Sequence, residues 1–296
     1  MTENAPIDTL LANRIRLLEA LTGARTLVFG ASHIDIDLLP PLYEALRKVG
    51  RVPALNLVVY LRGGEVNAAR RVALLLHRFT EHLRILVPHH CESSGTLLCL
   101  AAHEIVAGPL AMFSPIDPHM NGAEGGKGPS ALAAEDIRQF AKMSQDWFGL
   151  STEQAQTHAL SLLCNSIFPT TLTSFYRATR EMEAIGAELL ALPAHTAEAP
   201  AREAIVQALL YGFHSHDYAL TGADLSALGL PVRHDAEIED LAWDIACDIR
   251  RKIGPESRAA PQDDWGDAIV ATADAVRVRK RHRDRPMGVW TSTDGA

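Results

Sequence analysis

The run ALNLVVYLRGG, residues 54–64, decides the fold of this chain. It is rich in apolar and β-branched residues and is closed by two glycines, which is typical of a buried strand that ends in a sharp turn. A run with helical periodicity, EVNAARRVALLLHRF, follows at 65–79, and a second short apolar run, LRILVP, lies at 83–88. This order of strand, helix and strand predicts a βαβ unit, whose two strands lie parallel in one sheet.

The same alternation extends to both sides of this unit. Towards the N-terminus, TLVFG at 26–30 predicts a strand, and helices are expected over 8–22 and 38–49. Towards the C-terminus, CESSGTLLCLAAHEIVAG at 91–108 predicts a tight turn, a helix and a further strand. We therefore expect an α/β fold with a parallel sheet. Right-handed crossovers bring the carboxyl ends of its strands to one edge, where active sites gather in open α/β sheets.

The second half of the chain is organised differently. A stretch rich in glycine at 121–130 predicts a mobile loop, and 131–191 has helical patterning almost throughout. The segment 255–296 is rich in Pro, Gly, Asp and Arg, which is typical of a flexible tail. We therefore predict an N-terminal helix over 1–24 and a core over 25–254 that contains the helical insertion.

Composition excludes several classes of protein. The 296 residues are 47% hydrophobic and 22% charged, as in ordinary folded proteins. The formal net charge of −8 argues against nucleic-acid or anionic-membrane binding by the whole chain. No run approaches the roughly 18 apolar residues of a membrane span, and no signal-peptide pattern opens the chain. The four cysteines form no CxxC pair, so we expect reduced thiols and a cytoplasmic location.

Two strand ends carry the candidate chemistry, RGG at 62–64 and ESSG at 92–95. A double glycine after a strand leaves backbone N–H groups unpaired, and N–H groups aimed at one point form an oxyanion hole. A serine at the start of the following helix lies at the positive end of the helix dipole. Each pattern alone is more typical of a plain turn or a helix N-cap. Their combination on adjacent predicted strands indicates an active site.

Longer stretches around these strand ends resemble a known family. They are LVVYLRGGEVNAARRVALLLH at 57–77, VPHHCESSGTLLCLAAHEIVAGPLAMFSPIDP at 87–118 and SHDYALTGADLSALGLPV at 215–232. These stretches are similar to the serine dehydrogenase proteinase family, within the wider group of the Clp protease, signal peptide peptidase A and the crotonases. The resemblance runs from about residue 25 to 250. It implies a Clp/crotonase-like spiral of ββα units with an added helical region.

The resemblance also implies roles at the two strand ends. Ser93 falls on the nucleophile position, and Gly95 follows it by two residues as in the related peptidases. The backbone N–H groups of Gly63 or Gly64 and of Ser94 fall on the oxyanion-hole positions, and the Ser94 hydroxyl is an alternative nucleophile. The implied activity is that of a serine hydrolase acting as a peptidase on a peptide or protein substrate.

A general base is expected further along the chain. His119 stands 26 residues after Ser93, where the resemblance to Clp-type enzymes places a histidine base. Histidine suits the role because its pKa lies near the operating pH. Lys127, in the glycine-rich loop, is an alternative of the kind that signal peptide peptidase A uses, and a different residue or no base at all stays open.

The third member of a triad is less constrained. The family pattern favours Asp217, next to His216, whereas Asp117 is interpreted as a turn residue between two prolines. Cys91 is expected to be a buried, inert thiol. The histidines near these motifs lack HExxH spacing and the cysteines lack CxxC spacing, so we expect no metal and no cofactor.

Proteins of the Clp fold commonly form multimers, so the resemblance implies a homo-oligomer. The helical region 131–191 is the expected contact surface, because one subunit would struggle to bury all its apolar stripes. Two other functions stay open at this point. A crotonase-like acyl-CoA enzyme would use the same oxyanion hole for a thioester enolate. A non-catalytic oligomeric scaffold or sensor would use the fold alone.

Overall fold

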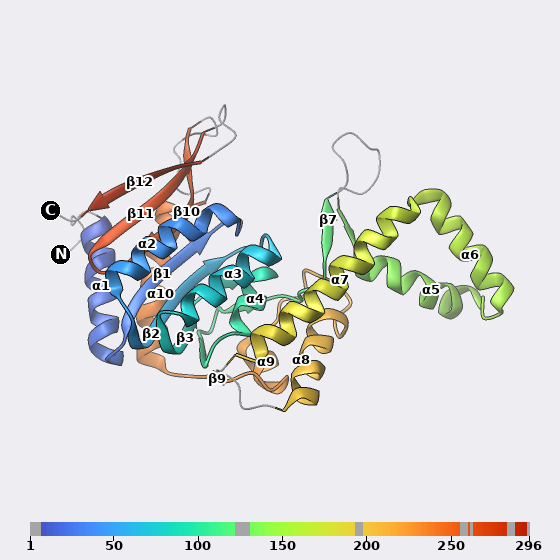
Figure 1. Ribbon diagram of the computed structural model, residues 1–296, viewed down its shortest axis with the longest axis horizontal. Coiled ribbons are helices and arrows are strands. Elements are labelled where there is room, and N and C mark those ends of the chain that lie inside the picture. Colours follow the sequence, from blue (N-terminus) through green and yellow to red (C-terminus); the bar gives the residue numbers. More distant parts are fainter. Residues whose placement is uncertain are drawn as a thin grey trace.

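A central sheet with helices on both faces forms the body of the molecule, and a long helical arm projects from it (Figure 1). The computed structural model describes residues 7–121, 131–192, 198–254, 260, 263–282 and 288–294. The strands of the sheet lie in the order β12-β11-β10-β1-β2-β3-β5-β9. Its parallel part consists of β1 (Arg25–Ala31), β2 (Val52–Leu61), β3 (Thr80–Val87), β5 (Glu104–Ala107) and β9 (Val232–Arg233). The predicted α/β fold class is confirmed.

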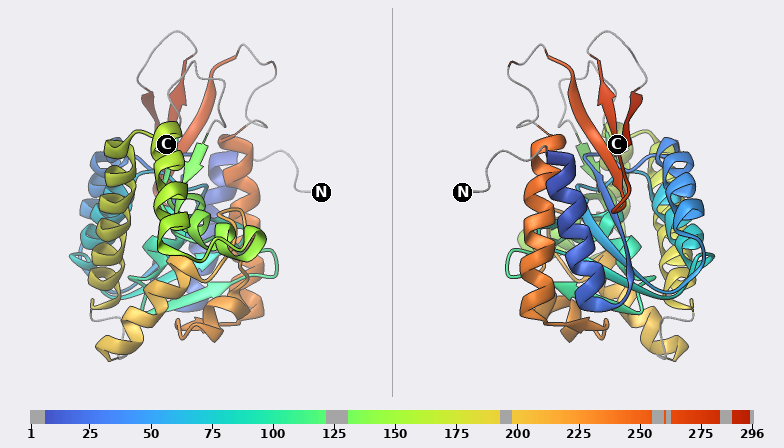
Figure 2. Two further views of the ribbon diagram at one scale, coloured as in Figure 1. Left: turned by 90° about the vertical axis from the view of Figure 1, so that its right-hand side faces the viewer. Right: turned by 90° about the vertical axis from the view of Figure 1, so that its left-hand side faces the viewer.

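Helices cover both faces of the parallel strands (Figure 2). Because successive side chains of a strand point to opposite faces, each strand contributes to two cores. Val28 and Val58 pack towards one side, and Leu57 and Ile85 pack towards the other. The first side is covered by α1 (Ile7–Thr22) and α10 (Ala236–Lys252). The second is covered by α2 (Leu39–Val49), which follows the short helix η1 (Ile36–Leu38), by α3 (Val66–His77) and by α4 (Ser94–Cys99).

The helical region expected at 131–191 forms the arm. Its helices are α5 (Ala134–Phe148), α6 (Glu153–Ser166) and α7 (Pro169–Leu190), and it is entered through the paired strands β7 (His119–Asn121) and β8 (Ala131–Ala133). The end of α7 returns to the body, where Met182, Ile185 and Leu189 are buried. Arg70 of α3 holds α7 there through Glu188. Next come α8 (Ala199–Tyr211) and α9 (Gly222–Ala227).

The prediction of a flexible tail at 255–296 is wrong for the residues that the structure describes. Three strands lie there, β10 (Trp265–Ala271), β11 (Ala275–Arg281) and β12 (Val289–Asp294), and β10 pairs antiparallel with β1. The charges that suggested a tail neutralise one another. Arg279 is only 2% exposed, and its guanidinium lies 2.8 Å from Asp267 and 2.7 Å from Asp35. At least one arginine of this basic run, Arg279, is therefore buried and ion-paired in the folded protein.

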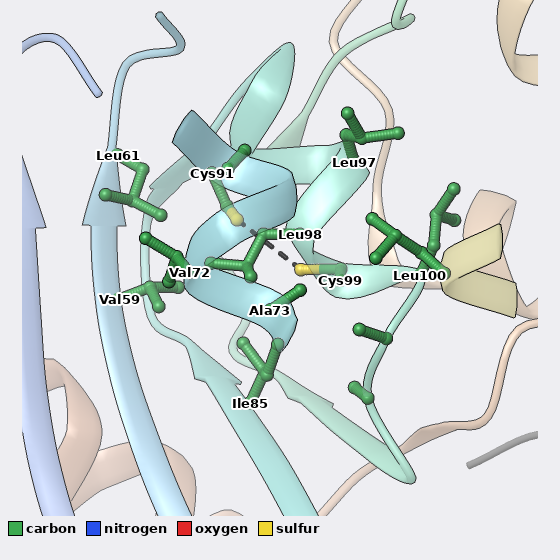
Figure 3. Close-up of a cluster of buried hydrophobic side chains, with 14 of the residues drawn as sticks. Val59, Leu61, Val72, Ala73, Ile85, Cys91, Leu97, Leu98, Cys99 and Leu100 are labelled. Atoms are coloured by element: carbon green, nitrogen blue, oxygen red, sulfur yellow. Dashed lines mark hydrogen bonds between the residues drawn. The ribbon is translucent and has the colours of Figure 1, made fainter. Parts of the chain in front are cut away.

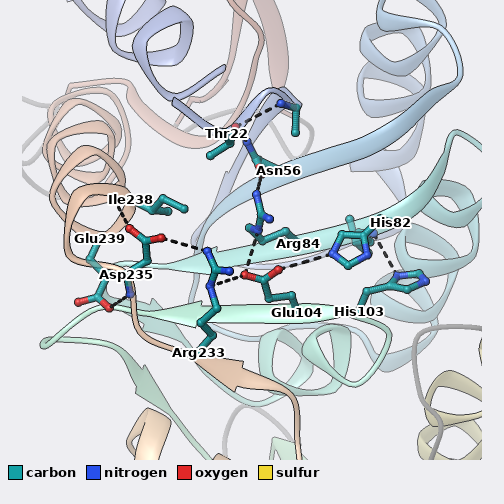
Figure 4. Close-up of polar contacts among 12 residues, drawn as sticks. Thr22, Asn56, His82, Arg84, His103, Glu104, Arg233, Asp235, Ile238 and Glu239 are labelled. Carbon is teal, nitrogen blue, oxygen red and sulfur yellow. Dashed lines mark hydrogen bonds and ion pairs between the residues drawn. The ribbon is translucent and has the colours of Figure 1, made fainter. Parts of the chain in front are cut away.

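Ion pairs hold the far edge strand of the parallel sheet in place (Figure 4). Glu104 at the start of β5 lies 3.1 Å from the Arg84 guanidinium of β3 and 2.9 Å from that of Arg233 in β9. Arg233 also contacts Asp235, the N-cap of α10. These contacts compensate for the shortness of β9. None of the helices in the described part of the chain combines the length and apolar character needed to span a bilayer.

Candidate active site

The structure brings the two glycine- and serine-containing strand ends together. The short strand β4 (His90–Cys91) lies parallel to the end of β2, where Cys91 pairs with Leu61. The Glu92 N–H donates a hydrogen bond to the Leu61 carbonyl at 3.0 Å. On its other side β4 pairs with β6 (Met112–Phe113). Residues 62–64, 92–95 and the loop after β6 therefore meet at the carboxyl edge of the sheet.

Ser93 has a strained backbone conformation. Its φ of 53° and ψ of −113° match the first central position of a type II′ turn, which glycine normally occupies. It is the only non-glycine residue with positive φ in the described part of the chain. Such a conformation costs about 1–3 kcal/mol and persists only where the surroundings enforce it. The nucleophile of α/β-hydrolases is likewise presented on a strained turn between strand and helix.

A hydrogen-bond chain enforces this turn. The Ser93 N–H donates to Ser114 Oγ at 2.8 Å, and the Ser114 N–H donates to Thr96 Oγ1 at 3.1 Å. The Thr96 hydroxyl in turn donates to the Cys91 carbonyl at 2.9 Å. Ser114 and Thr96 are buried. Neither was singled out from the sequence, because only the pairing of β4 with β6 brings Ser114 to Ser93.

The two glycines of the other strand end are required by space as well as by φ. A Cβ on Gly63 (φ 88°) would lie 3.1 Å from the Ser93 Cβ, and a Cβ on Gly64 (φ 142°) would lie 2.3 Å from the backbone N and O of Ile34. The Gly63 carbonyl is used, since it accepts from the Ile34 N–H. Within the described residues, no acceptor is found for the N–H groups of Gly63, Gly64 or Ser94. These are the groups that an oxyanion hole needs.

The two serines of the turn differ in access. Ser94 is 1% exposed, and its buried Oγ has no hydrogen-bond partner among the residues that the structure describes. Ser93 is only partly buried. Of the two hydroxyls, that of Ser93 is therefore the one that a substrate can reach.

A histidine–aspartate pair lies on the neighbouring loop. His216 Nδ1 is 2.8 Å from Asp117 Oδ1, and Asp117 is 6% exposed. Backbone hydrogen bonds between Phe113 and Leu220, both 2.9 Å, bring the two segments together. Asp117 follows Ser114 by three residues, which span at most about 11 Å of chain. The Asp117 backbone therefore lies within this distance of Ser114, whose hydroxyl accepts from the Ser93 N–H.

The structure describes the side chain of Asp217, the predicted third member of the triad, but not that of His119, the predicted base. His119 begins β7, but its side chain lies outside the described residues, as does all of Lys127. Asp217 is exposed, its N–H donates to Ser215 Oγ at 3.2 Å, and no partner of its carboxylate is found in the described part of the chain. The aspartate beside His216 is therefore Asp117. Sequence reasoning treated Asp117 as a turn residue and missed a partner 99 positions away.

Cys91 is well placed structurally but poorly placed for nucleophilic chemistry. It is fully buried among apolar side chains, and its Sγ lies 3.5 Å from that of Cys99 (Figure 3). Burial raises the pKa of the Cys91 thiol well above its ordinary value. A protonated, inaccessible thiol is a weak nucleophile. Among the described residues, no three His, Cys, Asp or Glu side chains are placed to hold a metal ion.

An apolar cavity of about 340 Å³ opens beside Asp117, between the arm and α8. Ile137, Leu172, Phe175 and Leu210 form its apolar walls. Its charged walls are paired: Glu135 accepts two hydrogen bonds from Arg138, and Glu183 contacts Arg180 and accepts from the Tyr211 hydroxyl. The cavity therefore presents apolar surface close to the histidine–aspartate pair.

The chain is similar in sequence to a family of known proteins. Residues 28–145 match the family model described as ClpP-like SDH-type serine proteinase. The predicted resemblance is confirmed. The matched segment contains both strand ends, Ser114 and Asp117, whereas His216 lies beyond it. The mixed α/β architecture agrees with the match.

Individual relatives give no further role. Two uncharacterized proteins of Methanocaldococcus jannaschii are similar: MJ0137 is 24% identical over 199 residues, 67% of this chain and 60% of the relative. MJ1495 is 28% identical over 200 residues, 67% of this chain and 59% of the relative. The chain thus spans about 60% of the length of these curated relatives. Among solved structures, a serine-to-alanine mutant of the 1510-N membrane-bound stomatin-specific protease is similar at 13% identity and a TM-score of 0.41, over 72% of this chain and 83% of that chain.

Proposed function

We propose that this protein is a serine peptidase with Ser93 as its nucleophile. The observation that carries the proposal is the strained turn at Ser93, beside N–H groups of Gly63, Gly64 and Ser94 that have no acceptor among the described residues. A match to a serine proteinase family over residues 28–145 supports it. A crotonase-like enzyme would need the N–H groups but not a serine hydroxyl, so it would leave the strain at Ser93 without a purpose.

In this mechanism Ser93 Oγ forms a bond to the carbonyl carbon of the scissile peptide, and a histidine takes the hydroxyl proton. The carbonyl oxygen becomes an oxyanion, which the N–H groups of Gly64 (or Gly63) and Ser94 stabilise. When the C–N bond breaks, the same histidine returns the proton to the leaving amine. Water then hydrolyses the acyl-serine by the reverse sequence of proton transfers.

Two histidines are candidates for the base. The sequence predicts His119, from its distance to Ser93. His216 has the support that a catalytic imidazole requires, because the Asp117 carboxylate 2.8 Å from its Nδ1 fixes the ring tautomer and stabilises the imidazolium form. Nε2 of His216 is then the atom that would accept the serine proton.

The cavity beside Asp117 suggests the substrate. Its apolar walls and paired charges favour a large apolar side chain over a charged one, since a charge placed there would lose its hydration without gaining a free partner. We propose peptides with such a residue near the scissile bond as substrates.

The test is labelling with a fluorophosphonate, followed by intact-mass measurement. Attack by Ser93 Oγ on phosphorus releases fluoride and adds one phosphonyl group per chain. We expect one adduct on the wild-type protein and none on Ser93→Ala. Separate His119→Ala and His216→Ala variants identify the base by a loss of labelling rate, and His214→Ala, which removes an exposed neighbouring histidine, is the control.

Each result has a definite meaning. Labelling that survives in Ser93→Ala would contradict the assigned nucleophile. A folded wild-type protein that stays unlabelled, with a circular dichroism spectrum typical of mixed α/β structure, would contradict the peptidase proposal and favour a scaffold role.

A further inference from the structure

A second cavity, of about 430 Å³, lies on the side of the sheet edge that α10 covers. Its lining residues come from the ends of β1 and β2, from β4 and the turn before it, and from the last turn of α10 and the two residues that follow it. They are Ser32, Tyr60, Arg62, His89, His90, Arg250, Ile253 and Gly254. In α/β proteins, ligands bind outside the carboxyl ends of the strands, which is where this cavity lies.

The charge of the cavity is opposite to that of the chain. Its lining contains two arginines and two histidines and, among the described residues, no aspartate or glutamate. The whole chain carries a net charge of −8. Burial lowers the pKa of His89 most, and the neighbouring His90, Arg250 and Arg62 lower it further, against an opposing effect of the Glu92 carboxylate. A cavity whose lining carries two guanidinium groups and no carboxylate favours an anionic ligand.

Arg62 is the group best placed to meet that anion. One of its guanidinium nitrogens, Nη2, lies 3.0 Å from His90 Nε2, and His90 Nδ1 lies 3.2 Å from Glu92 Oε2. Contact with His90 lowers the pKa of Glu92, so the carboxylate is ionised at neutral pH. In the neutral tautomer that carries its proton on Nδ1, His90 directs this proton towards Glu92, and its Nε2 accepts from Arg62.

The contact with His90 uses one nitrogen of the Arg62 guanidinium and leaves its other nitrogens available for a ligand. The side chain is exposed, and in the described part of the chain no carboxylate lies within 4.0 Å of it. Arginine binds carboxylate and phosphate groups through two parallel N–H bonds, so one occupied nitrogen does not exhaust it. The partial negative charge at the C-terminus of α10 opposes an anion, but Arg250 in the last turn of that helix offsets it.

We infer that this cavity binds a small molecule through a carboxylate or phosphate group, with Arg62 as its main contact. The volume lies in the range of small-molecule pockets. Tyr60 and Ser32 add hydroxyl groups to the same lining. The inference goes beyond the peptidase proposal, because it requires no chemistry at Ser93.

The test uses the full chain in its Ser93→Ala form, so that binding is measured without turnover. The protein is titrated with inorganic phosphate and, separately, with acetate, at an ionic strength held constant with chloride. The readouts are calorimetry and the NMR signal of the His89 ring, which a His89→Gln variant assigns. We expect saturable binding of at least one anion and a rise in the pKa of His89 on binding, because the anion offsets the local positive field.

Variants at Arg62 decide the assignment. Arg62→Gln should weaken binding by about tenfold or more, and Arg62→Lys, which keeps the charge but loses the fork, should fall between it and the parent. Arg71→Gln, which removes an exposed arginine of α3, should bind as the parent does. Circular dichroism checks that each variant is folded.

The outcomes separate the two sources of the anionic group. Binding of phosphate alone indicates a phosphorylated ligand, and binding of acetate indicates a carboxylate ligand; either supports the site. Absence of saturable binding by both anions in the millimolar range would overturn the inference, as would an unchanged affinity in Arg62→Gln. These results are independent of whether Ser93 reacts with a fluorophosphonate.

Discussion

Ser93, Gly63 and Gly64 depend on one another at the scale of single residues. The position where a Cβ would sit on Gly63 is 3.1 Å from the Ser93 Cβ, so this strand end can approach the serine turn only without a side chain. Gly64 is pressed against the Ile34 backbone in the same way, and the bridge between them holds the Gly64 N–H in place. The strained turn at Ser93 therefore packs against Gly63 and Gly64, and neither glycine can be replaced by a larger residue without a clash.

Gly64→Ala is expected to unfold more easily than the wild type. The new Cβ would lie 2.3 Å from the Ile34 backbone, which has no flexible side-chain end to move aside. We expect a loss of more than about 3 kcal/mol in the free energy of unfolding, measured by urea denaturation.

Gly23→Ala is the control, because Gly23 also has positive φ (67°) but has no neighbour within 4 Å of the new Cβ. It should lose only about 1–2 kcal/mol. Equal losses would show that φ alone, and not the contact with Ile34, matters.

Asp117 and Asp217 can be distinguished by a matched pair of substitutions. If Asp117 orients His216, Asp117→Asn should lower the rate of fluorophosphonate labelling by roughly 10²–10⁴-fold. Asp217→Asn, which alters an exposed carboxylate, should label at the wild-type rate. The reverse result would restore the role that the sequence predicts for Asp217 and would leave the His216–Asp117 contact as a structural one.

The sequence predicts the two strand ends of the site better than the groups around them. Glycines after one strand and serines after the next are local signals, and adjacent parallel strands bring such ends together. The pairing of Asp117 with His216 joins residues 99 positions apart, across the whole arm. Ser114 was missed for a related reason, since its role depends on β6 lying beside β4. Contacts of this kind depend on the tertiary fold rather than on local spacing.

At the scale of elements, helices and buried parallel strands were predictable because each has a regular apolar pattern. The C-terminal strands were not, because the apolar–polar alternation in the run VRVRKRHRDR at 276–285 is confined to Val276–Arg279 and is followed by consecutive charged residues and a histidine. The sequence of this segment does not show which carboxylates pair with Arg279. Asp35, which precedes η1, and Asp267 in β10 together allow an arginine to occupy a buried position in β11. A buried charge is tolerated only when paired and hydrogen-bonded, and such pairs are not visible in a single segment.

Asp267→Asn tests how firmly these strands are attached. Loss of one carboxylate leaves the buried Arg279 only partly compensated, so we expect the free energy of unfolding to fall by about 3 kcal/mol. Glu44→Gln breaks a solvent-exposed ion pair of the same strand, with Arg277, and should cost less than about 1 kcal/mol. Both are measured by urea denaturation. Equally small losses would mean that β10–β12 behave as the dispensable tail that composition suggested.

Tyr211 joins α8 to α7 through a hydrogen bond from its hydroxyl to Glu183 at 2.9 Å. Burial, followed by the contact with Glu183, raises its pKa to about 12. In the unfolded chain the phenol loses its proton near pH 10, so between about pH 10 and 12 the unfolded state binds fewer protons. The stabilising contribution of Tyr211 is therefore complete below about pH 10 and declines as the pH rises towards 12.

Tyr211→Phe should remove this part of the pH dependence. We expect the free energy of unfolding of the variant to fall less than that of the wild type between about pH 9 and pH 11. Tyr176→Phe, at an exposed tyrosine of α7, should keep the wild-type slope. Identical slopes in all three proteins would show that Tyr211 titrates at its ordinary pKa and that the contact with Glu183 is weak.

At the scale of the whole molecule, the body and the arm have different surfaces. The body buries its apolar residues in two cores, one on each face of the sheet. The arm leaves large apolar side chains in solvent: Trp147 is 78% exposed, Phe168 is 72% exposed and Phe148 is 66% exposed. Exposed apolar patches on soluble proteins commonly mark interaction sites, and we expect one on the arm. A second copy of this chain is the partner that the sequence resemblance implies.

We therefore expect the protein to be a homo-oligomer whose contacts involve the arm. Replacing Trp147 and Phe168 together by serine should convert it to a monomer in sedimentation velocity at micromolar concentration. The free energy of unfolding of the isolated subunit should change little, because both side chains are already solvent-exposed in it.

The control is Leu17→Ser, which removes an exposed leucine from α1, on the body, and should leave the mass of the oligomer unchanged. A wild-type protein that sediments as a monomer would contradict this expectation. Dissociation by Leu17→Ser alone would place the contact on α1 instead of the arm.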